Sequence, residues 1–370
     1  MLTINRKFNF SAAHRSLNPL WSDEKNLHYY DNGFLGDPGH GHNYQAFFIF
    51  SGPIDEKTGM VMELSKLKRL VEENVVAGYD HKFINEDVAV FKNRPVTTEN
   101  LALYMLKEAE CLFENEVIHP VSCHVIESDK AEATAYSGGL VERYINLKLP
   151  VNKANEETFC QKKLDLKLVI AGSFVPETGV ILPEANIKKI CGDLIRDFRG
   201  RDCLCKNPLW QIAKDIWEYV EDLLPIRKVV VVDDSDCYFE YIGDDQCVVV
   251  VRDLFCASHK LINRELSEEK NRELFGKCHQ FHGHSFNVEL AVKVAGCAPK
   301  KLLCELAGGL KRVIDPWRHQ NLNKLEVFSE QVSTGELVIQ VLKDKITKEI
   351  GRDVYRLRLW ETDNNRFCLR

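Results

Sequence analysis

The chain has 370 residues, of which 45% are hydrophobic and 28% charged, so it can bury one large core or several modest ones. Its formal net charge of −6, without a basic stripe interleaved with aromatic residues, argues against a nucleic-acid partner. No apolar stretch has the length of a signal peptide or a membrane span, so we expect a cytoplasmic protein with no membrane partner. The thirteen cysteines are an odd number spread along the chain, and most are expected to be reduced and buried.

The first 150 residues alternate between strand-like and helix-like patterns. The predicted elements are, in chain order, a strand at 45–50, helices at 63–74 and 99–110, and strands at 122–126 and 133–136. Leu64, Leu67 and Val71 follow one another at helical spacing, which supports the first helix. With an opening strand before these elements, the order predicts an α+β module whose two helices cover one face of an antiparallel sheet.

Four motifs of this first part recur in the same order near the end of the chain. FSAAH at 10–14 recurs as FCASH at 255–259, HGHNY at 40–44 as HGHSF at 282–286, TTE at 97–99 as TGE at 334–336, and IES at 126–128 as WET at 360–362. Four ordered matches about 240 residues apart indicate two related copies. We predict complete modules at 1–150 and 246–370, the second opening with a strand at 247–252. In that module, Ser333 and Glu336 have the spacing of a capping box that begins a helix.

The residues between the two copies carry a weaker repeat. The segment 171–181, with Thr-Gly at 178–179, resembles 51–61, with Thr-Gly at 58–59. A helix is predicted at 210–224 and a strand at 228–234. We therefore predict a degenerate module at 158–245, preceded by a polar linker at 152–157. This module lacks both histidine motifs, and we expect it to have lost the opening strand and the metal ligands.

Two sets of three histidines accompany the complete modules. A His-x-His pair on a strand places both imidazoles on one face, and a third histidine from a neighbouring strand can complete the set. The sets are His14, His40 and His42, and His259, His282 and His284. Three neutral histidines leave one position open, as in catalytic zinc sites. A lone histidine is more often a core or surface residue, but the trio occurs twice, so we expect Zn²⁺ at both sets.

Cys278 lies four residues before His282, on the segment that leads into the second His-x-His pair. A thiol near a dication ionises more easily and can serve as a base or nucleophile close to neutral pH. The alternative is a buried structural cysteine, the commonest kind in a cytosolic protein. The first module has Gly36 at the matching position, so it lacks this thiol.

Asp80 and His81 follow the first predicted helix. A carboxylate beside an imidazole can orient the ring and raise its basicity, which suits a proton relay. The last module keeps the histidine as His319 but has Arg318 in place of the aspartate.

Glu127 and Glu361 end apolar strand runs. A carboxylate there can accept two parallel hydrogen bonds from the amidine-like edge of a guanine or pterin ring. The alternative is an ordinary acidic residue at the end of a strand.

Together these motifs resemble the 6-pyruvoyl- and 6-carboxy-tetrahydropterin synthases, and the resemblance covers nearly the whole chain. It implies tunnelling-fold modules, each an antiparallel four-stranded sheet with two helices on one face. In this family three modules close their sheets into a barrel, so this chain would form a pseudo-trimeric barrel alone. The implied activity is that of a zinc-dependent carbon–oxygen lyase, which eliminates triphosphate from 7,8-dihydroneopterin triphosphate.

The resemblance also implies roles for individual residues. Cys278 would accept a proton, Asp80 and His81 would relay protons, and Glu361 or Glu127 would anchor the pterin. The remaining substrate contacts would come from Thr98, Glu99, Thr334 and Glu336. Family sites take the Asp-His pair from a neighbouring subunit, so we expect the first and third modules to build one complete site, with the middle module as a scaffold. Two such chains are a candidate homodimer.

Three functional alternatives remain at this point. The spacing from Cys278 to His282 resembles the carboxy-type enzymes, whereas HGHNY at 40–44 resembles the pyruvoyl type, so the product stays open. The lost ligands also fit a decayed enzyme that binds zinc or pterin without turnover. Zinc-dependent hydrolysis is the weakest alternative, because the chain has no HExxH-like helix. Retention of Cys278 beside a full set of histidines favours the enzyme.

Overall fold

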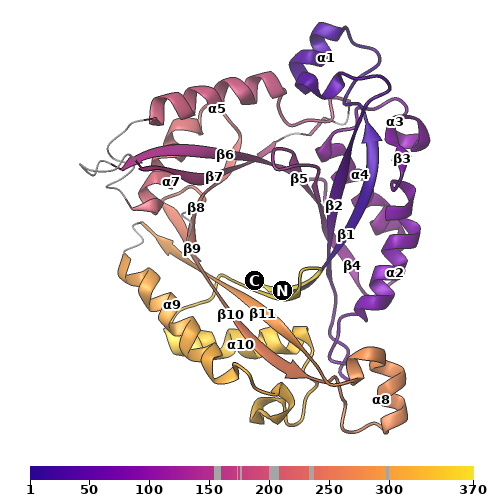
Figure 1. The fold of residues 1–370 in the computed structure, drawn as a ribbon, viewed down its shortest axis with the longest axis vertical. Helices are drawn as coiled ribbons and strands as arrows, with labels where there is room; N and C mark the ends of the chain where they lie inside the picture. Colours follow the sequence, from indigo (N-terminus) through magenta and orange to yellow (C-terminus); the bar gives the residue numbers. More distant parts are fainter. Residues whose placement is uncertain (154–159, 173, 176, 200–207, 233–236, 297–299) are drawn as a thin grey trace.

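The computed structural model describes residues 1–153, 160–172, 174–175, 177–199, 208–232, 237–296 and 300–370. Thirteen strands of these residues form one sheet, which closes on itself because β1 (Leu2–His14) pairs with β13 (Asn365–Leu369). Figure 1 shows the strands as the inner layer of a ring and the helices on its outer face. The predicted α+β class, with a closed barrel of strands, is confirmed.

The elements follow one another in three similar groups. The first contains β1, α1 (Asp23–Tyr30), β2 (His40–Ser51), α2 (Leu64–Asn74), β3 (Lys82–Phe83), α3 (Ile84–Asp87), α4 (Thr98–Leu112), β4 (His119–Ile126) and β5 (Glu132–Tyr136). The second contains β6 (Val141–Lys153), β7 (Cys160–Gly172), α5 (Glu184–Phe198), α7 (Leu209–Val220), β8 (Ile226–Val232) and β9 (Cys237–Tyr241). The third contains β10 (Gln246–His259), α8 (Glu268–Phe275), β11 (His282–Ala295), α9 (Lys300–Ile314), α10 (Gly335–Ile350), β12 (Arg356–Thr362) and β13. Each predicted helix and strand overlaps one of these elements, although residues 233–234 of one predicted strand lie outside the described residues.

The middle group differs from its prediction at its beginning. A long strand, β6, precedes β7 and runs across the predicted boundary at residue 150. It pairs with β7 throughout, with Val141 opposite Gly172 and Lys153 opposite Cys160. This group therefore has an opening strand in front of β7, without a histidine. Residues 154–157 of the predicted linker lie outside the described residues.

The predicted capping box at the start of α10 is wrong. Thr334, not Ser333, is the N-cap, and its hydroxyl accepts a hydrogen bond from the backbone N–H of Leu337. The carboxylate of Glu336 does not return to the cap, because it accepts a hydrogen bond from the backbone N–H of Val61 in the first group. A contact between distant parts of the chain thus replaces the local motif.

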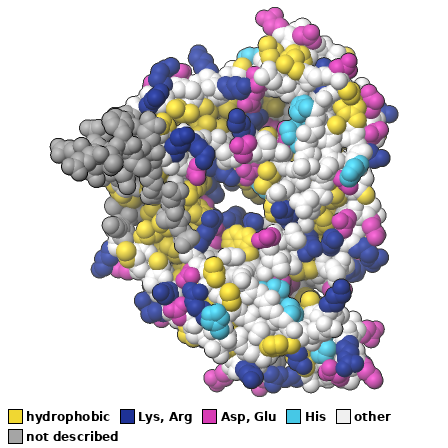
Figure 2. All heavy atoms as spheres, in the orientation of Figure 1, with side chains coloured by type: hydrophobic (Ala, Val, Ile, Leu, Met, Phe, Trp, Pro, Cys, Tyr) yellow, Lys and Arg dark blue, Asp and Glu magenta, His cyan; other side chains and the backbone are white. Residues whose placement is uncertain are grey.

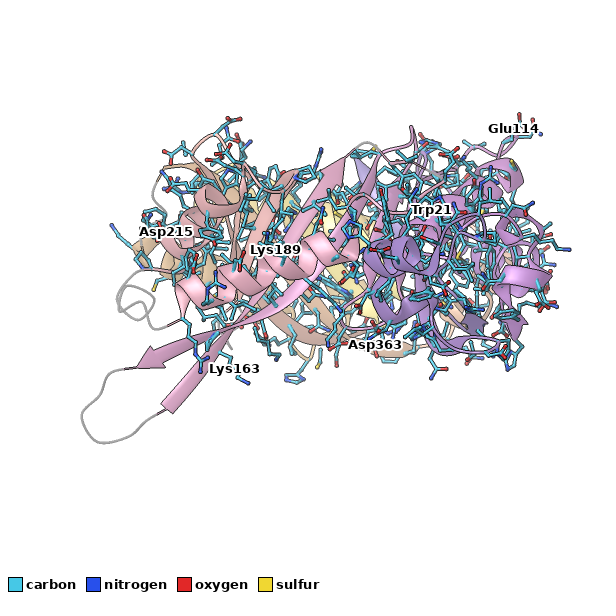
Figure 3. All side chains as sticks on the ribbon, turned by 90° about the horizontal axis from the view of Figure 1, so that it is seen from above. Trp21, Glu114, Lys163, Lys189, Asp215 and Asp363 are labelled. Atoms are coloured by element: carbon cyan, nitrogen blue, oxygen red, sulfur yellow. The ribbon has the colours of Figure 1, made fainter. Side chains whose placement is uncertain are left out.

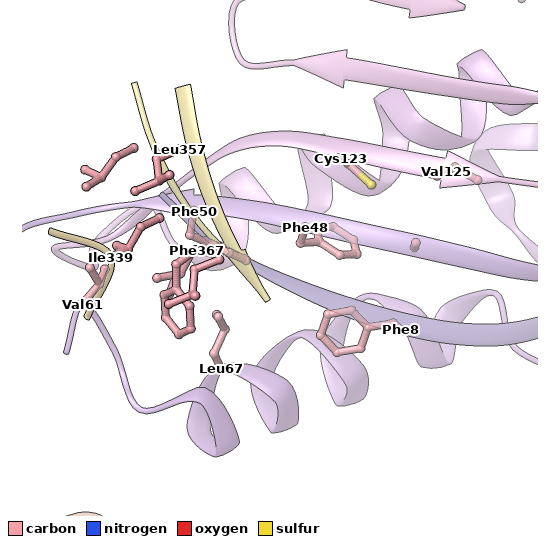
Figure 4. Close-up of a cluster of buried hydrophobic side chains, with 14 of the residues drawn as sticks. Phe8, Phe48, Phe50, Val61, Leu67, Cys123, Val125, Ile339, Leu357 and Phe367 are labelled. Carbon is pink, nitrogen blue, oxygen red and sulfur yellow. The ribbon is translucent and has the colours of Figure 1, made fainter. Parts of the chain in front are cut away.

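One hydrophobic core joins the two ends of the chain. Figure 4 shows Phe8 and Phe48 above α2, with Phe50 close to Phe367 and Leu357 of the last two strands. Phe48 and Phe50 are fully buried. Burying one such side chain stabilises the fold by about 1.5–3 kcal/mol, so this seam is a main reason for the ring to close. A second core lies under α5 and α7.

Two further features concern the outside of the ring. Figure 3 shows the ends of β6 and β7, near Lys163, projecting beyond the body of the molecule. Among the described residues, no helix has the length and apolar character to cross a membrane.

Candidate metal centres and active site

Each set of predicted zinc ligands is brought together where two neighbouring strands meet. The first cluster consists of His14, His40, His42 and Glu127, and the second of His259, His282 and His284. In each cluster the potential ligand atoms all lie within 4.8 Å of one another. The geometry is the same in both, because His14 lies opposite His40 on β1 and β2 and His259 lies opposite His282 on β10 and β11.

Backbone contacts orient the histidine rings for metal binding. Nδ1 of His14 lies 3.1 Å from the carbonyl oxygen of Val96, and Nδ1 of His259 lies 2.9 Å from that of Ser333. A carbonyl only accepts, so Nδ1 donates and Nε2 keeps a free lone pair. The buried Nε2 atoms without a hydrogen-bond partner are those of His14, His42, His259 and His284. Burial lowers the pKa of His14 and His259 to about 4, so both are neutral at pH 7, and the donor set fits Zn²⁺.

The two clusters differ in their nearby glutamate. Oε1 of Glu127 lies 3.4 Å from Nε2 of His42, and its Oε2 accepts a hydrogen bond of 2.9 Å from the Thr98 hydroxyl. Thr98 thereby turns the other oxygen toward the histidines. Glu361 is 3.6 Å from His284; Gly335 replaces Thr98 in the repeat, and the side chain that hydrogen-bonds Glu361 is Asn365 instead. Burial raises the pKa of Glu361 to about 7.

Gly335 has a steric reason to be glycine. A Cβ at this position would lie 2.0 Å from the ring of Phe367. We expect Gly335→Ala to destabilise the protein by about 1–3 kcal/mol, measured by urea unfolding, because the ring must move out of a packed core. Gly192→Ala on α5 is the matched control, since a Cβ there meets nothing within 4 Å. The control should be neutral or stabilising, and equal losses in both variants would contradict this account.

Cys278 lies in the short 3-10 helix Gly276–His279, just before β11 in the chain, and it is near enough to Glu361 for that carboxylate to act on its thiol. Burial raises the pKa of its thiol, and the carboxylates of Glu361 and Glu63 raise it further. Burial and these two carboxylates therefore oppose ionisation of the Cys278 thiol, which is predicted from sequence to be promoted by a nearby dication. A dication at the second cluster would act against the two carboxylates.

A loop from the first group completes the second site. The carbonyl of Gly59 accepts a hydrogen bond of 2.6 Å from the Thr334 hydroxyl, and the N–H of Val61 donates to Glu336 at 3.1 Å. The loop ends at Glu63, the carboxylate that acts on Cys278. The second site is therefore built from both ends of the chain. The first site has an equivalent neighbour, because the Thr97 hydroxyl donates to the carbonyl of Gly179 in the second group.

Arg143 distinguishes the first site, and sequence reasoning missed it. Its guanidinium lies 3.2 Å from Glu99 and also pairs with Glu184. Burial raises the pKa of Glu99, while Arg143 counteracts that shift. Arg143 of β6 lies opposite Ile170 of β7. At the equivalent place in the first group, Ile4 of β1 lies opposite Phe50 of β2. The second site thus has an isoleucine where the first has an arginine, a difference visible only once the strand registers are known.

Among the described residues, no cation pairs with Glu336 as Arg143 pairs with Glu99. Burial raises the pKa of Glu336 from 4.5 to about 8, and the nearby Glu361 adds to the shift. A carboxyl group with a raised pKa stabilises the fold only in its protonated form. This contribution is complete below pH 4.5 and is lost as the pH rises through about 8.

We expect Glu336→Gln to remove this pH dependence. Glutamine keeps an oxygen that can accept the Val61 hydrogen bond but cannot ionise. The metal-free variant should match the wild type near pH 5 and exceed its free energy of unfolding by about 1–3 kcal/mol near pH 9. Urea unfolding at both pH values measures this. A wild type that is no less stable at pH 9 than its variant would contradict the assignment.

Asp80 and His81 lie beside the end of β1. The Asp80 carboxylate accepts a hydrogen bond of 2.9 Å from the N–H of Ser11 and lies 3.0 Å from Nδ1 of His81. The His81 side chain is 83% exposed. Among the described residues, no hydrogen bond or ion pair joins this pair to Cys278, and Figure 1 shows β3 of the first group above α2 and α8 of the third group below it. His319 repeats the left-handed backbone of His81, with φ of 59° against 55°.

Comparison with known proteins identifies the family. The sequence profile described as 6-pyruvoyl tetrahydropterin synthase matches residues 3–137 and 248–370. This chain therefore belongs to the 6-pyruvoyl tetrahydropterin synthase family, and the predicted membership is confirmed. The middle residues 138–247 lie outside the match.

Individual relatives agree with this assignment. The Drosophila melanogaster 6-pyruvoyl tetrahydrobiopterin synthase is 41% identical over 123 residues, which cover 31% of this chain and 71% of that protein. The Homo sapiens protein of the same name is 39% identical over 127 residues, covering 34% and 85%. A putative 6-carboxy-5,6,7,8-tetrahydropterin synthase from Archaeoglobus fulgidus is 41% identical over 69 residues, covering 19% and 54%. The solved Caenorhabditis elegans 6-pyruvoyl tetrahydropterin synthase has 28% identity and a TM-score of 0.32, covering 34% of this chain and 95% of that chain.

Proposed function

We propose that this chain is a zinc-dependent tetrahydropterin synthase that acts on 7,8-dihydroneopterin triphosphate and eliminates triphosphate. The observation that carries this proposal is the second site. There a full set of metal-binding histidines lies with Cys278, the buried Glu336 and the partly exposed Glu361. Membership of a pterin synthase family supports the substrate class.

The residues of the second site have separate tasks in this reaction. Zinc, held by the three histidines of the second cluster, would supply Lewis-acid chemistry. Cys278 would remove a carbon-bound proton, and triphosphate would leave with the electron pair. Glu336 and Glu361 would accept hydrogen bonds from the N–H edge of the pterin, which favours their ionised forms. The loop that carries Val61 would help to keep water out of the pocket.

We assign a structural role to the first cluster. It has no cysteine at the position of Cys278, and Glu127 lies close enough to its histidines to supply a fourth ligand. Four protein ligands make a closed zinc site, which stabilises a fold rather than binding substrate. Arg143 beside Glu99 adds a cation where the second site has none, which disfavours the same pterin contact.

Three modules in one chain are the simplest account of the architecture. Each group of elements has two long strands, helices on the outer face, and two shorter strands, and the first group also has the two-residue β3. Because β6 opens the second group, we place the module boundaries near residues 140 and 245. The middle module would serve as a scaffold that closes the barrel.

We propose that Asp80 and His81 act on Cys278 of a second chain. The pair is exposed, and Asp80 is hydrogen-bonded to Ser11, which lies three residues before His14 on β1. A homodimer that stacks two rings end to end would bring the pair of one chain toward the second site of the other.

Co-expression of Cys278→Ala and His81→Ala chains tests this arrangement. Each homodimer should be inactive, while mixed dimers should hold one intact site in two, restoring about a quarter of wild-type turnover at random mixing. No recovery in mixed dimers that are shown to form would contradict it.

The proposed activity is tested with zinc-loaded protein and 7,8-dihydroneopterin triphosphate, with products identified by mass spectrometry. We expect release of triphosphate, and the pterin product will distinguish pyruvoyl from carboxy chemistry. Tight pterin binding without turnover would contradict the enzyme and favour a pterin-binding protein.

A further inference from the structure

The inside of the barrel is a positively charged cavity of about 1440 Å³. Nine Lys or Arg and four Asp or Glu side chains line it, although the whole chain has a net charge of −6. Figure 2 shows Lys and Arg side chains around the central hollow. The positive charge is thus concentrated inside the barrel, where the surrounding low-dielectric protein strengthens its electric field.

Five cations on the inner faces of β8, β10, β12 and β13 form what we call the basic wall. Its members are Lys228, Arg252, Arg356, Arg358 and Arg366.

Two carboxylates form ion pairs with members of the basic wall. Glu240 lies 3.2 Å from Lys228 and 2.9 Å from Arg356. Glu289 lies 2.9 Å from Arg252 and 2.8 Å from Arg358. Five cations share two carboxylates, which leaves an excess of three positive charges.

Arg366 is not among the residues that line the cavity, but it is near enough to Arg358, Arg252 and Glu289 to belong to the same charge cluster. Its guanidinium lies 4.7 Å from the ring of Trp360 and 5.8 Å from that of Phe47, and its buried Nε has no hydrogen-bond partner. Among the described residues no carboxylate pairs with it. Burial, with a contribution from Arg358, lowers the pKa of Arg366 to about 10, so it stays charged at pH 7. A guanidinium held on two aromatic faces with unused donors is ready to bind an anion.

The basic wall is separate from the histidine clusters. Side chains alternate along a strand, so Glu289 of β11 lies on the opposite face from His284. His259 is buried toward the helices, whereas Arg252 and Arg358 line the central cavity. The wall is therefore available without any contact to the candidate active site.

We propose that the barrel interior is a binding site for polyphosphate anions such as inorganic triphosphate, held by the basic wall. A multiply charged anion matches the excess of three cations, and the planar guanidinium groups fit phosphate oxygens. The site is independent of the proposed reaction, because none of its residues belongs to the catalytic pocket.

Calorimetric titration of the zinc-loaded full chain with sodium triphosphate tests this site. We expect binding at physiological ionic strength that weakens with added salt. Arg252→Gln and Arg366→Gln should each weaken it about tenfold, the effect of losing one close charge pair. Arg196→Gln, on the exposed outer face of α5, is the control and should bind as the wild type does.

His284→Ala separates the cavity from the zinc site. The proposal expects this variant to keep triphosphate binding. Loss of binding in His284→Ala together with wild-type binding in Arg252→Gln would place the anion on zinc and overturn the proposal, as would no binding by the wild type. Arg252 is half exposed, so its variant remains informative even if Arg366→Gln fails to fold.

Discussion

Replacing His284 by alanine is expected to abolish turnover, whereas His42→Ala is expected to leave turnover largely intact and to lower thermal stability. The two residues occupy equivalent positions in their clusters, since His42 lies opposite Ala12 and His284 opposite Ala257. Their surroundings differ, because the second site has Cys278 and Glu336, whereas the first has Gly36 and the Arg143–Glu99 ion pair at the matching positions. Equivalent substitutions therefore test the proposal that the second site is catalytic and the first structural.

Three measurements on each variant test this expectation. Zinc content should fall from two ions per chain to one in both. Turnover should fall at least about 100-fold in His284→Ala, because zinc and the groups around it act as one unit. The melting temperature should fall more in His42→Ala, because zinc bound only to the native state stabilises it and the first cluster ties β1, β2 and β4 together. A comparable loss of turnover in both variants would contradict the division of roles.

The fold was predictable where local patterns and repeats dominate. Strands β4 and β5 and helices α2 and α4 follow from periodicity, and the repeated motifs predict their partners near the end of the chain. The predictions were wrong where a contact between residues far apart in sequence determines the local structure. Ser333 and Glu336 have capping-box spacing, yet Glu336 is held by Val61, which is 275 residues away in sequence. The strand β6 runs across the predicted boundary at residue 150, because no histidine or glycine motif marks its beginning.

Some residues of the candidate sites could likewise be predicted from local sequence patterns, and others could not. Histidines at His-x-His spacing could be paired from sequence because strand alternation fixes their direction. Arg143 could not be found, since its role depends on the register of β6 against β7 and on a contact with α4. The contribution of Glu63 to the surroundings of Cys278 depends on how the first and third groups pack, and no local pattern encodes that.

Cys278→Ala is expected to lower kcat by about 10²–10⁴-fold while leaving zinc content and folding unchanged, because it removes the proposed base but no metal ligand. Cys304→Ala is the matched control. Cys304 is also exposed, but it lies on α9, and its loss should not affect turnover. A Cys278→Ala protein with wild-type turnover would exclude the thiol as the base.

The ionisation of Cys278 can be followed directly by its rate of alkylation with iodoacetamide as a function of pH. In metal-free protein, burial and the carboxylates of Glu361 and Glu63 hold the thiol pKa above its ordinary value, so alkylation should be slow at pH 8. Adding zinc should shift the profile to lower pH, since a dication favours the thiolate. Glu63→Gln should shift it in the same direction without metal, because one of the opposing carboxylates is gone. A profile that neither zinc nor Glu63→Gln changes would mean that the thiol lies too far from the second cluster to serve it.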